Sequence, residues 1–352
     1  MREKDNFSKP LILWYLKNRR DLPWRKSSDP YKIWLSEIIL QQTRIAQGTE
    51  YYEKFTTEFD TVLELAAASE EQVLKLWQGL GYYSRARNLH ATAKNIVGEL
   101  GGKFPGNYKG LLRLKGVGDY TASAIASIAF DLPHATVDGN VYRVLSRYFG
   151  ISTPIDSSKG IKEFKALAQE LLDPEQPGNH NQAVMELGAL VCTPKIPSCE
   201  TCPLQGKCYA HLSKETRLFP IKKGKIKVRK RYFNYLVLDS SEGLTRIQKR
   251  TGRDIWKHLY EFPLLESSES IADLESIENQ VVSEFNLGEG YGLKKFNAQT
   301  VIHKLSHQEL HLDFWLVQTD EKPDQTTAWK DLENHALPVP LQNFVDKYKG
   351  LS

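Results

Sequence analysis

The sequence has little cysteine and no long apolar run. No stretch approaches the roughly 20 apolar residues that span a bilayer, and the polar start, Met1 to Pro10, lacks the apolar segment of a secretory signal. We therefore expect a cytoplasmic protein without a membrane partner. The four cysteines all fall within residues 192–208, which is unlike the spread-out disulfide framework of small secreted proteins.

Among the charged residues, acidic ones are the minority in the first part of the chain and the majority in the second. Residues 1–231 contain 35 Lys and Arg against 24 Asp and Glu, whereas residues 232–352 contain 12 against 19. The basic part suits a polyanion such as nucleic acid, and the acidic part should add little attraction for phosphate. The hydrophobic fraction of 41% and the charged fraction of 26% exclude a disordered or fibrous chain.

The length of 352 residues predicts at least two domains, since a single core stops growing at roughly 250–300 residues. Residues 1–212 predict helices joined by short loops. In residues 121–130, for example, the apolar positions recur on one helical face. The segment 213–231 is rich in Lys and Arg. Its composition fits a solvated linker, a segment lying against a phosphate backbone, or both.

Residues 232–352 change period and predict an α+β domain. Tyr232–Leu238 is aromatic and β-branched, as expected of a strand, and Leu244–Lys249 is a candidate partner of this strand in a hairpin. Leu310–Val317 predicts another strand and Ile271–Phe285 a helix. The chain should therefore consist of a mostly α region, a basic linker and this α+β domain.

The cysteines form the strongest motif, Cys192-x6-Cys199-x2-Cys202-x5-Cys208. Four thiolates can hold a [4Fe–4S] cluster. Structural zinc sites usually supply two close pairs of ligands, and here only Cys199 and Cys202 form such a pair. The spacing therefore favours iron–sulfur over zinc, and four unligated thiols are the third interpretation.

Two glycines separate one predicted helix from the next in the segment Leu114-Lys115-Gly116-Val117-Gly118-Asp119-Tyr120. Glycine permits positive φ and close approach of the backbone. The N-terminus of the following helix offers free N–H groups and a positive dipole end. The segment predicts either a phosphate-binding hairpin or an ordinary tight turn.

Two carboxyl groups are candidates for acid–base chemistry. Glu37 shares a helical face with Trp34 and Ile33, and a carboxyl on an apolar face should have a raised pKa and serve as a general acid. Asp138 stands before a helical run that ends at Phe149. The alternatives are a Glu37 that reaches water at the helix border and an Asp138 that only caps its helix.

The hairpin, the downstream aspartate and the four-cysteine loop occur in this order along the chain. This combination resembles the helix-hairpin-helix DNA glycosylase superfamily with its iron–sulfur loop, over most of residues 20–210. In the endonuclease III branch a lysine after the hairpin forms a Schiff base with the sugar, whereas here Tyr120 has that position. Lys115 stands where the family usually has proline. The stretches that look like the adenine-specific mismatch glycosylases, the MutY branch, are Glu37 with Gln41-Gln42-Thr43, Gly79–Arg87, Tyr120 and Asp138-Gly139-Asn140.

The resemblance implies two helical lobes for residues 1–212 and a monomeric, monofunctional bacterial enzyme that acts on double-stranded DNA at the nucleoid. Its substrate would be adenine opposite 8-oxoguanine or guanine. Glu37 would protonate adenine N7, Asp138 would stabilise the sugar cation, and Tyr120 and Asn140 would position them. The implied adenine pocket contains Trp24, Arg25 and Gln182, and the implied DNA contacts are Gln42, Leu80, Tyr82, Gly116, Val117 and Gly118.

Residues 232–352 resemble the MutT-like C-terminal domain of the same enzymes. The stretch His303-Lys304-Leu305-Ser306-His307 is similar to the loop that recognises 8-oxoguanine, which implies this role for Leu305, Ser306 and His307. Leu305 replaces the usual Phe, and the pattern by itself is also that of an ordinary polar turn. The Glu-rich metal box of Nudix hydrolases is absent from Ile271–Phe285, so pyrophosphate hydrolysis is not expected.

Two rival functions remain at this point. A bifunctional glycosylase/lyase would need a lysine where Tyr120 stands. A DNA-binding protein without enzymatic activity would not need both Glu37 and Asp138.

Overall fold

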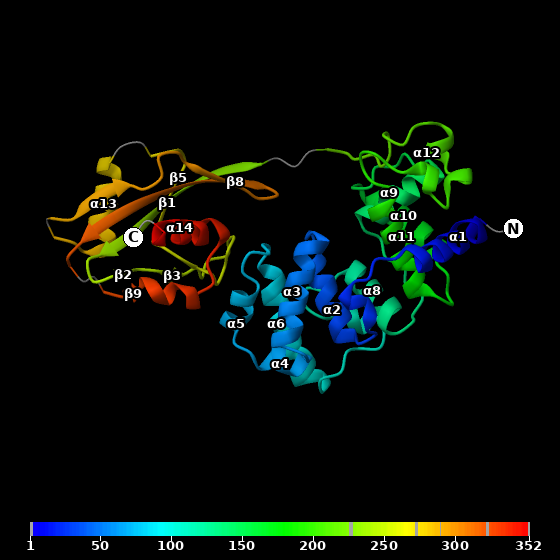
Figure 1. Cartoon of the computed structure of the whole chain (residues 1–352), viewed down its shortest axis with the longest axis horizontal. Coiled ribbons are helices and arrows are strands. Elements are labelled where there is room, and N and C mark those ends of the chain that lie inside the picture. Colours follow the sequence, from blue (N-terminus) through cyan, green and yellow to red (C-terminus); the bar gives the residue numbers. More distant parts are fainter. Residues whose placement is uncertain (1–2, 225–227, 272–273, 289, 322–323, 351–352) are drawn as a thin grey trace. The chain divides into compact units, whose positions relative to one another are not determined.

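The computed structural model describes residues 3–224, 228–271, 274–288, 290–321 and 324–350. The chain folds into two compact units (Figure 1). Unit 1 comprises residues 1–68 and 87–224, and unit 2 comprises residues 69–86 and 225–352. The grouping of 69–86 with the C-terminal half was not expected from any pattern in the sequence.

Unit 1 is helical. Its helices are α1 (Glu3–Asn18), α2 (Pro30–Leu40), α3 (Ile45–Glu58), α4 (Val62–Ala67), α6 (Ser84–Leu100, which begins in unit 2), α7 (Tyr108–Leu112), α8 (Asp119–Ala129), α9 (Gly139–Phe149), α10 (Ser158–Leu171), α11 (Pro177–Leu190) and α12 (Tyr209–Leu212). Short 3₁₀ turns occur at Pro23–Lys26, Cys199–Thr201 and Gln205–Lys207.

Local signals explain where several of these helices begin. The Asp29 side chain caps α2 by accepting a hydrogen bond from the Tyr31 N–H, and Pro30 occupies the first helical position. The Ser157 hydroxyl caps α10 in the same way, accepting from the Gly160 N–H. These caps fix the residues at which α2 and α10 begin.

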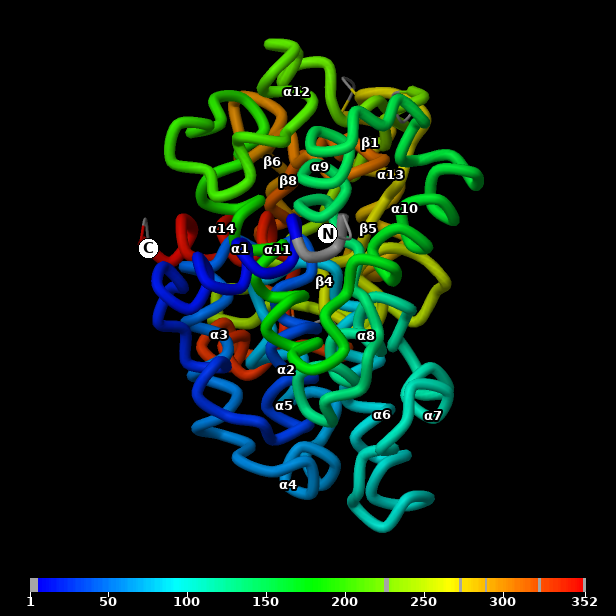
Figure 2. Tube along the Cα trace, turned by 90° about the vertical axis from the view of Figure 1, so that its right-hand side faces the viewer, coloured from blue at the N-terminus to red at the C-terminus, as the bar shows by residue number. Residues whose placement is uncertain are grey.

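One core of unit 1 is shared by α1, α9, α10 and α11. Phe7 and Leu11 of α1 pack with Val144, Phe164 and Leu187, and α1 lies beside α11 (Figure 2). Three of the four cysteines pack against the same core. The cysteine loop is therefore anchored on the helices that carry residues 138–149 and 177–190.

Unit 2 is built on a mixed β-sheet. Its elements are α5 (Glu70–Leu76), β1 (Arg229–Ser240), β2 (Leu244–Thr245), β3 (Gln248–Lys249), β4 (Tyr260–Glu261), β5 (Leu264–Ser267), α13 (Leu274–Phe285), β6 (Gly292–Lys295), β7 (Val301–Lys304), β8 (Gln308–Thr319), β9 (Thr327–Ala328), a 3₁₀ helix (Trp329–Asn334) and α14 (Val339–Lys349).

The sheet has the strand order β5-β1-β8-β6, and β7 pairs with β8. The long strands β1 and β8 are parallel, whereas β5, β6 and β7 run antiparallel to their neighbours. Because side chains alternate along a strand, Leu236 and Trp315 face α13, while Tyr235 and Phe314 face the other side, where Phe314 stacks on Phe344 of α14. Helices thus cover both faces (Figure 1), which explains the nearly continuous apolar sequence of β1.

The expected hairpin between Tyr232–Leu238 and Leu244–Lys249 is wrong. In the structure β2 pairs with β9 and β3 pairs with β4. Both edges of β1 are occupied by β5 and β8, so the strand has no free edge for a local partner. The end of the basic segment also enters the sheet, because β1 already begins at Arg229.

Candidate active site and nucleic-acid contacts

Unit 1 contains a cavity of about 330 Å³ between α2, α8, α9 and α11. Seven residues singled out from the sequence as catalytic or adenine-binding line it: Trp24, Arg25, Glu37, Tyr120, Asp138, Asn140 and Gln182. They come from five separate segments of the chain. The fold therefore collects these predicted residues into one concave site of the size and kind that binds a small ligand.

Glu37 projects from α2 into this cavity. Part of its side chain is reachable from the cavity, but protein atoms surround the carboxyl, and this desolvation raises its pKa from 4.5 to about 7. A hydrogen bond with Tyr120 opposes the shift, the charge of Asp138 adds to it, and Arg25 lowers it slightly. Glu37 can therefore hold a proton near neutral pH and release it, as a general acid must.

Asp138 is the N-cap of α9. One carboxylate oxygen accepts hydrogen bonds from the N–H groups of Asn140 and Val141, at 2.9 and 2.8 Å, and the other accepts from the Asn140 side-chain amide at 2.8 Å. Capping and a site function were alternatives for this residue in the sequence. The structure shows that Asp138 caps the helix and lines the cavity as well.

Tyr120, at the start of α8, is close enough to Glu37 and Asp138 for both charges to act on its hydroxyl. Its hydroxyl has two hydrogen-bond partners, Glu37 and Met185 Sδ, the latter at 3.2 Å, and its single proton is donated to one of them at a time. Burial raises the pKa of Tyr120 well above its ordinary value, and the negative charges of Glu37 and Asp138 raise it further. Tyr120 therefore remains a neutral hydrogen-bonding group throughout the working pH range.

Glu186 and Arg20 also line the cavity, and sequence reasoning missed both. Glu186 is buried on α11, and its two oxygens accept hydrogen bonds from Arg20 and Arg25 at 2.6–3.0 Å. Burial alone would raise the pKa of Glu186, but the two guanidinium groups outweigh it and lower the pKa to about 2. A lone carboxyl in an apolar helix, the signal used for Glu37, could have revealed it.

Arg143 connects the cavity to the cysteine loop. Its guanidinium donates to the Asn140 side-chain oxygen at 2.8 Å, to the Cys192 carbonyl at 2.7 Å and to the Gly188 carbonyl at 2.7 Å. Gly188 allows α11 to approach Asn140 of α9 closely, because a Cβ at position 188 would lie only 2.6 Å from the Cβ of Asn140. The orientation of Asn140, and through it of Asp138, thus depends on how the chain leaves α11.

The four cysteines line one small cavity together with Arg147. All four are half-buried and none is in a disulfide. An Arg147 N–H donates to Cys192 Sγ at 3.3 Å, and burial raises the pKa of Cys202 to about 11 in the absence of a bound cation. Among the described residues, no three His, Cys, Asp or Glu side chains are close enough together to bind a single metal ion.

The glycine hairpin is the connection between α7 and α8. Gly116 has φ +77°, and a Cβ there would lie 2.7 Å from the Asn88 Cβ, so this position requires glycine. The Thr92 hydroxyl donates to the Lys115 carbonyl and fixes the loop without a proline. Gly116 and Gly118 are exposed at the N-terminus of α8, whereas Val117 is buried.

The remaining residues predicted to contact DNA do not line the cavity. Gln42 is exposed after α2, in the left-handed region at φ +56°. Leu80 and Tyr82 are in unit 2; Leu80 is buried, while Tyr82 is 46% exposed with φ +47°. Arg85 stabilises the loop that contains them. Its guanidinium lies over the rings of Trp77 and Tyr82. It also donates hydrogen bonds to the carbonyls of Leu80 and Gly81.

Leu305, Ser306 and His307 form the turn between β7 and β8. The Leu305 N–H donates to the Gln308 carbonyl at 2.8 Å and closes this turn. The Ser306 hydroxyl is exposed and forms a hydrogen bond with the Tyr82 hydroxyl. Unit 2 therefore brings together two of the predicted contact sites that lie far apart in the sequence.

Comparison with known families agrees with this site. Residues 35–173 match the family of HhH-GPD superfamily base excision DNA repair proteins, and residues 234–347 match the NUDIX domain family. Adenine DNA glycosylase from Buchnera aphidicola subsp. Schizaphis graminum is 34% identical, and the alignment covers 97% of this chain and 99% of that protein. The chain belongs to the adenine DNA glycosylase family.

Other similar proteins match about three fifths of the chain. Adenine DNA glycosylase from Rattus norvegicus is 48% identical over 58% of this chain and 42% of its own length. A thermostable thymine-DNA glycosylase of known structure shares 30% identity and a TM-score of 0.56 over 60% of this chain and 97% of that protein. An endonuclease III–DNA complex, 21% identical with a TM-score of 0.52 over 61% of this chain, shares the fold.

This adenine DNA glycosylase is thus an enzyme of base-excision repair that hydrolyses the N-glycosyl bond of adenine in DNA. In the described part of the chain, no helix is both long and apolar enough to cross a membrane.

Proposed function

We propose that this enzyme removes adenine mispaired with 8-oxoguanine or guanine, and that it does so with two carboxyl groups and no covalent amine intermediate. The observation that carries the proposal is the single cavity that gathers Glu37, Tyr120, Asp138 and Asn140. An enzyme that acts on a base inside a duplex must first flip the nucleotide into a pocket. Trp24, Arg25 and Gln182 would line the adenine end of this pocket, together with Glu186 and Arg20.

In this mechanism Glu37 donates its proton to N7 of adenine, which makes the base a better leaving group. The pKa of about 7 supports this role, because the carboxyl is still protonated in a large share of molecules at neutral pH. Asp138 is held by three N–H donors, so its charge is oriented before the sugar becomes cationic. Glu37, now ionised, then activates the attacking water, as in other two-carboxylate glycoside hydrolyses.

The substitution Asp138→Asn tests the charge at constant shape, and Glu37→Gln tests the proton. Each should lower the single-turnover rate of adenine release by several orders of magnitude while DNA binding stays nearly unchanged. Glu58→Gln, at an exposed carboxylate of α3, is the matched control and should behave as wild type. Near wild-type rates for both site variants would show that these carboxyl groups do not carry the reaction.

The lyase alternative makes a different prediction. Tyr120 cannot form a Schiff base, so borohydride should trap little covalent complex between the wild-type enzyme and its DNA. Efficient trapping, abolished by no single substitution of a lysine near the hairpin, would contradict the monofunctional mechanism.

We propose a [4Fe–4S] cluster as the group that the four cysteines hold. All four line one small cavity, and their spacing in the sequence favours this cluster, which four thiolates can hold. The cluster would tie the loop after α11 together, since the acid–base groups lie elsewhere. Purified protein should contain about four irons and absorb near 400 nm; stoichiometric zinc without iron would refute this assignment.

Recognition of the opposite base would depend on the exposed Ser306. A hydroxyl both donates and accepts hydrogen bonds, so it can distinguish the groups by which 8-oxoguanine differs from guanine. Ser306→Ala should reduce the rate preference for 8-oxoguanine by about fivefold, the equivalent of about 1 kcal/mol for one hydrogen bond. Gln42 and Tyr82 would fill the gap left in the duplex, and Gly116, Val117 and Gly118 would bind phosphate. The enzyme would act as a monomer in the cytoplasm.

A further inference from the structure

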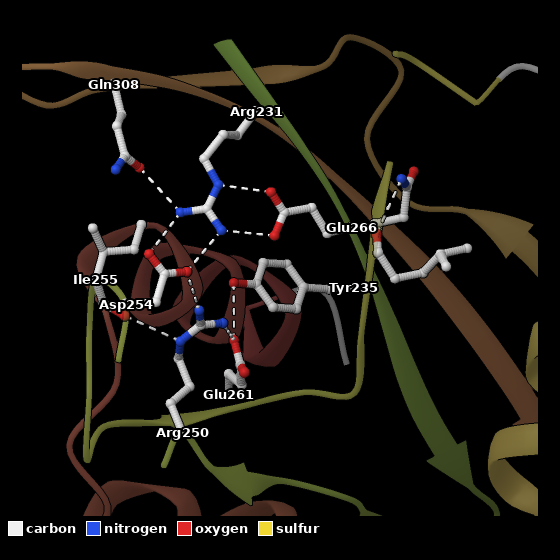
Figure 3. A network of polar contacts seen from close by, with 10 residues as sticks. Arg231, Tyr235, Arg250, Asp254, Ile255, Glu261, Glu266 and Gln308 are labelled. Carbon is white, nitrogen blue, oxygen red and sulfur yellow. Dashed lines mark hydrogen bonds and ion pairs between the residues drawn. The ribbon is translucent and has the colours of Figure 1, made fainter. Parts of the chain in front are cut away.

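Unit 2 contains a polar network that the proposed mechanism does not use; its two arginines and Glu261 are largely buried, whereas Asp254 and Glu266 reach the surface. Five charged side chains make it up, and we call it the Arg231 network: Arg231, Arg250, Asp254, Glu261 and Glu266 (Figure 3). It lies beside the turn of residues 305–307, because Gln308, the next residue after that turn, accepts a hydrogen bond from it.

Arg231 uses all five of its N–H donors. It binds Glu266 and Asp254 in a bidentate manner at 2.6–2.8 Å, and the fifth N–H reaches the Gln308 side-chain oxygen at 3.1 Å. Its side chain is only 8% exposed. A fully occupied planar guanidinium has one orientation, so Gln308 is held by a rigid group.

The partners of Arg231 are themselves fixed. Arg250 donates to Asp254 at 2.9 Å and to Glu261 at 2.6 Å, and the Tyr235 hydroxyl donates to Glu261 at 3.3 Å. Figure 3 shows the two guanidinium groups bridged by the Asp254 carboxylate. The network therefore connects β1, the segment of residues 250–261 that ends in β4, and β5 to a single point at the start of β8.

Gln308 is the residue through which this rigidity reaches the turn. Its carbonyl accepts the hydrogen bond from Leu305 that closes the turn, and its side chain is held by Arg231. The strand beside it adds a second attachment, because the Arg229 N–H donates to the His307 carbonyl at 3.0 Å. Ser306 thus projects from a turn that is fixed on both sides.

Stability alone is a weak reason for such a network. The exposed carboxylates Asp254 and Glu266 gain little from their ion pairs, and the attraction of the buried groups is largely offset by the cost of removing them from water. In some proteins such groups instead select one arrangement of the chain. Here the group that the network holds is Gln308, whose carbonyl closes the turn.

We propose that Arg231 is a positioning residue for opposite-base recognition, holding the Leu305–Ser306–His307 turn in place through Gln308. The inference rests on the proposed role of this turn in recognising 8-oxoguanine. A small polar side chain discriminates between two purines only if its hydroxyl is placed to a fraction of an ångström. Arg231 would supply that placement without touching DNA.

The decisive variants change Gln308, because Arg231→Met would leave Asp254 and Glu266 without their partner and could prevent folding. Gln308→Met removes the acceptor at nearly constant length and keeps the backbone hydrogen bond to Leu305. Gln308→Glu keeps an acceptor for Arg231. Arg246→Met is the control, since Arg246 is a partly buried arginine of unit 2 that pairs with Glu284 of α13, away from the turn.

Two readouts are measured on the full-length protein: the ratio of single-turnover rates with adenine opposite 8-oxoguanine and opposite guanine, and hydrogen exchange of the Leu305 amide. Gln308→Met should lower the ratio by up to about fivefold, the loss expected when the Ser306 hydroxyl no longer contributes. It should speed the exchange by about tenfold, as expected for losing one charge-assisted hydrogen bond. Gln308→Glu and Arg246→Met should leave both readouts at wild-type values.

The proposal is overturned if Gln308→Met exchanges at the wild-type rate, or if exchange accelerates and the ratio stays constant in an enzyme whose ratio does fall with Ser306→Ala. A ratio that Ser306→Ala leaves unchanged would instead refute the proposed role of the turn. In that case the exchange rates still decide whether Arg231 fixes it.

Discussion

The environment of Glu37 makes a stability prediction that is independent of catalysis. Burial raises its pKa from 4.5 to about 7, so the folded protein holds a proton that the unfolded chain releases. Stability from this site is complete below pH about 4.5 and is lost as the pH rises to about 7. The shift of about 2.5 units corresponds to about 3 kcal/mol at 1.36 kcal/mol per unit, and water entering the cavity makes this an upper value.

Glu37→Gln imitates the protonated carboxyl and cannot ionise. Relative to wild type, it should be nearly neutral at pH 4.5 and more stable by up to about 3 kcal/mol at pH 9. Urea unfolding at a series of pH values, followed by a signal from unit 1, measures the difference. Glu58→Gln, on the exposed side of α3, should show no such pH dependence.

If the difference in unfolding free energy between Glu37→Gln and wild type is constant from pH 4.5 to 9, folding does not raise the pKa of Glu37. If the variant instead becomes less stable than wild type as the pH rises, the folded protein prefers the ionised carboxyl. We expect Glu37→Gln to be more stable than wild type at high pH but inactive, because reactive groups in active sites often cost stability.

Three further predictions concern contacts around the site and within unit 2. Arg143→Met should destabilise unit 1 by about 2–4 kcal/mol, because it removes buried charged hydrogen bonds, and it should slow adenine release more than it weakens DNA binding, since Asn140 loses its anchor. Gly188→Ala should lower the melting temperature, at a cost of about 1–3 kcal/mol for overpacking, whereas Gly98→Ala, with open space around it, should not. A double-mutant cycle on Glu71 and Lys249, whose side chains are 52% and 34% exposed, should give a coupling below about 1 kcal/mol that vanishes in high salt.

Periodicity was sufficient to predict that unit 1 is helical, with α8 as an example, and to predict the two long strands of unit 2. Buried faces repeat locally, as in α8, and β1 and β8 are apolar because both of their faces are covered. The pairing of the strands could not be predicted from periodicity. Leu244–Lys249 was assigned to the nearest strand, yet the partners of β1 are β5 and β8, and nothing local specifies a contact over such a sequence separation.

The residues that line the cavity could be singled out where they belong to short motifs, and their roles stay predictions. Glu37 and Asp138 stand out because one is a lone carboxyl on an apolar face and the other precedes a helix. Glu186 was missed although it has the first of these properties, and Arg20 was missed because its role depends on Glu186. The union of residues 69–86 with unit 2 arises from side-chain contacts that no periodicity reports.

That discontinuity limits how the chain can be divided. Residues 69–86 lie between two parts of unit 1 in the sequence, yet Glu70 and Glu71 pair with His258, Tyr260 and Lys249 of the C-terminal half. A cut in the basic linker would therefore not release two complete modules, since the first fragment would keep a segment whose partners are gone. Likewise, a C-terminal half grafted onto another glycosylase would lack a piece of its own structure. The order of residues along the chain suggests two separable domains. Because the segment that carries Tyr82 folds with the half that carries Ser306, however, the two have to be exchanged or redesigned together.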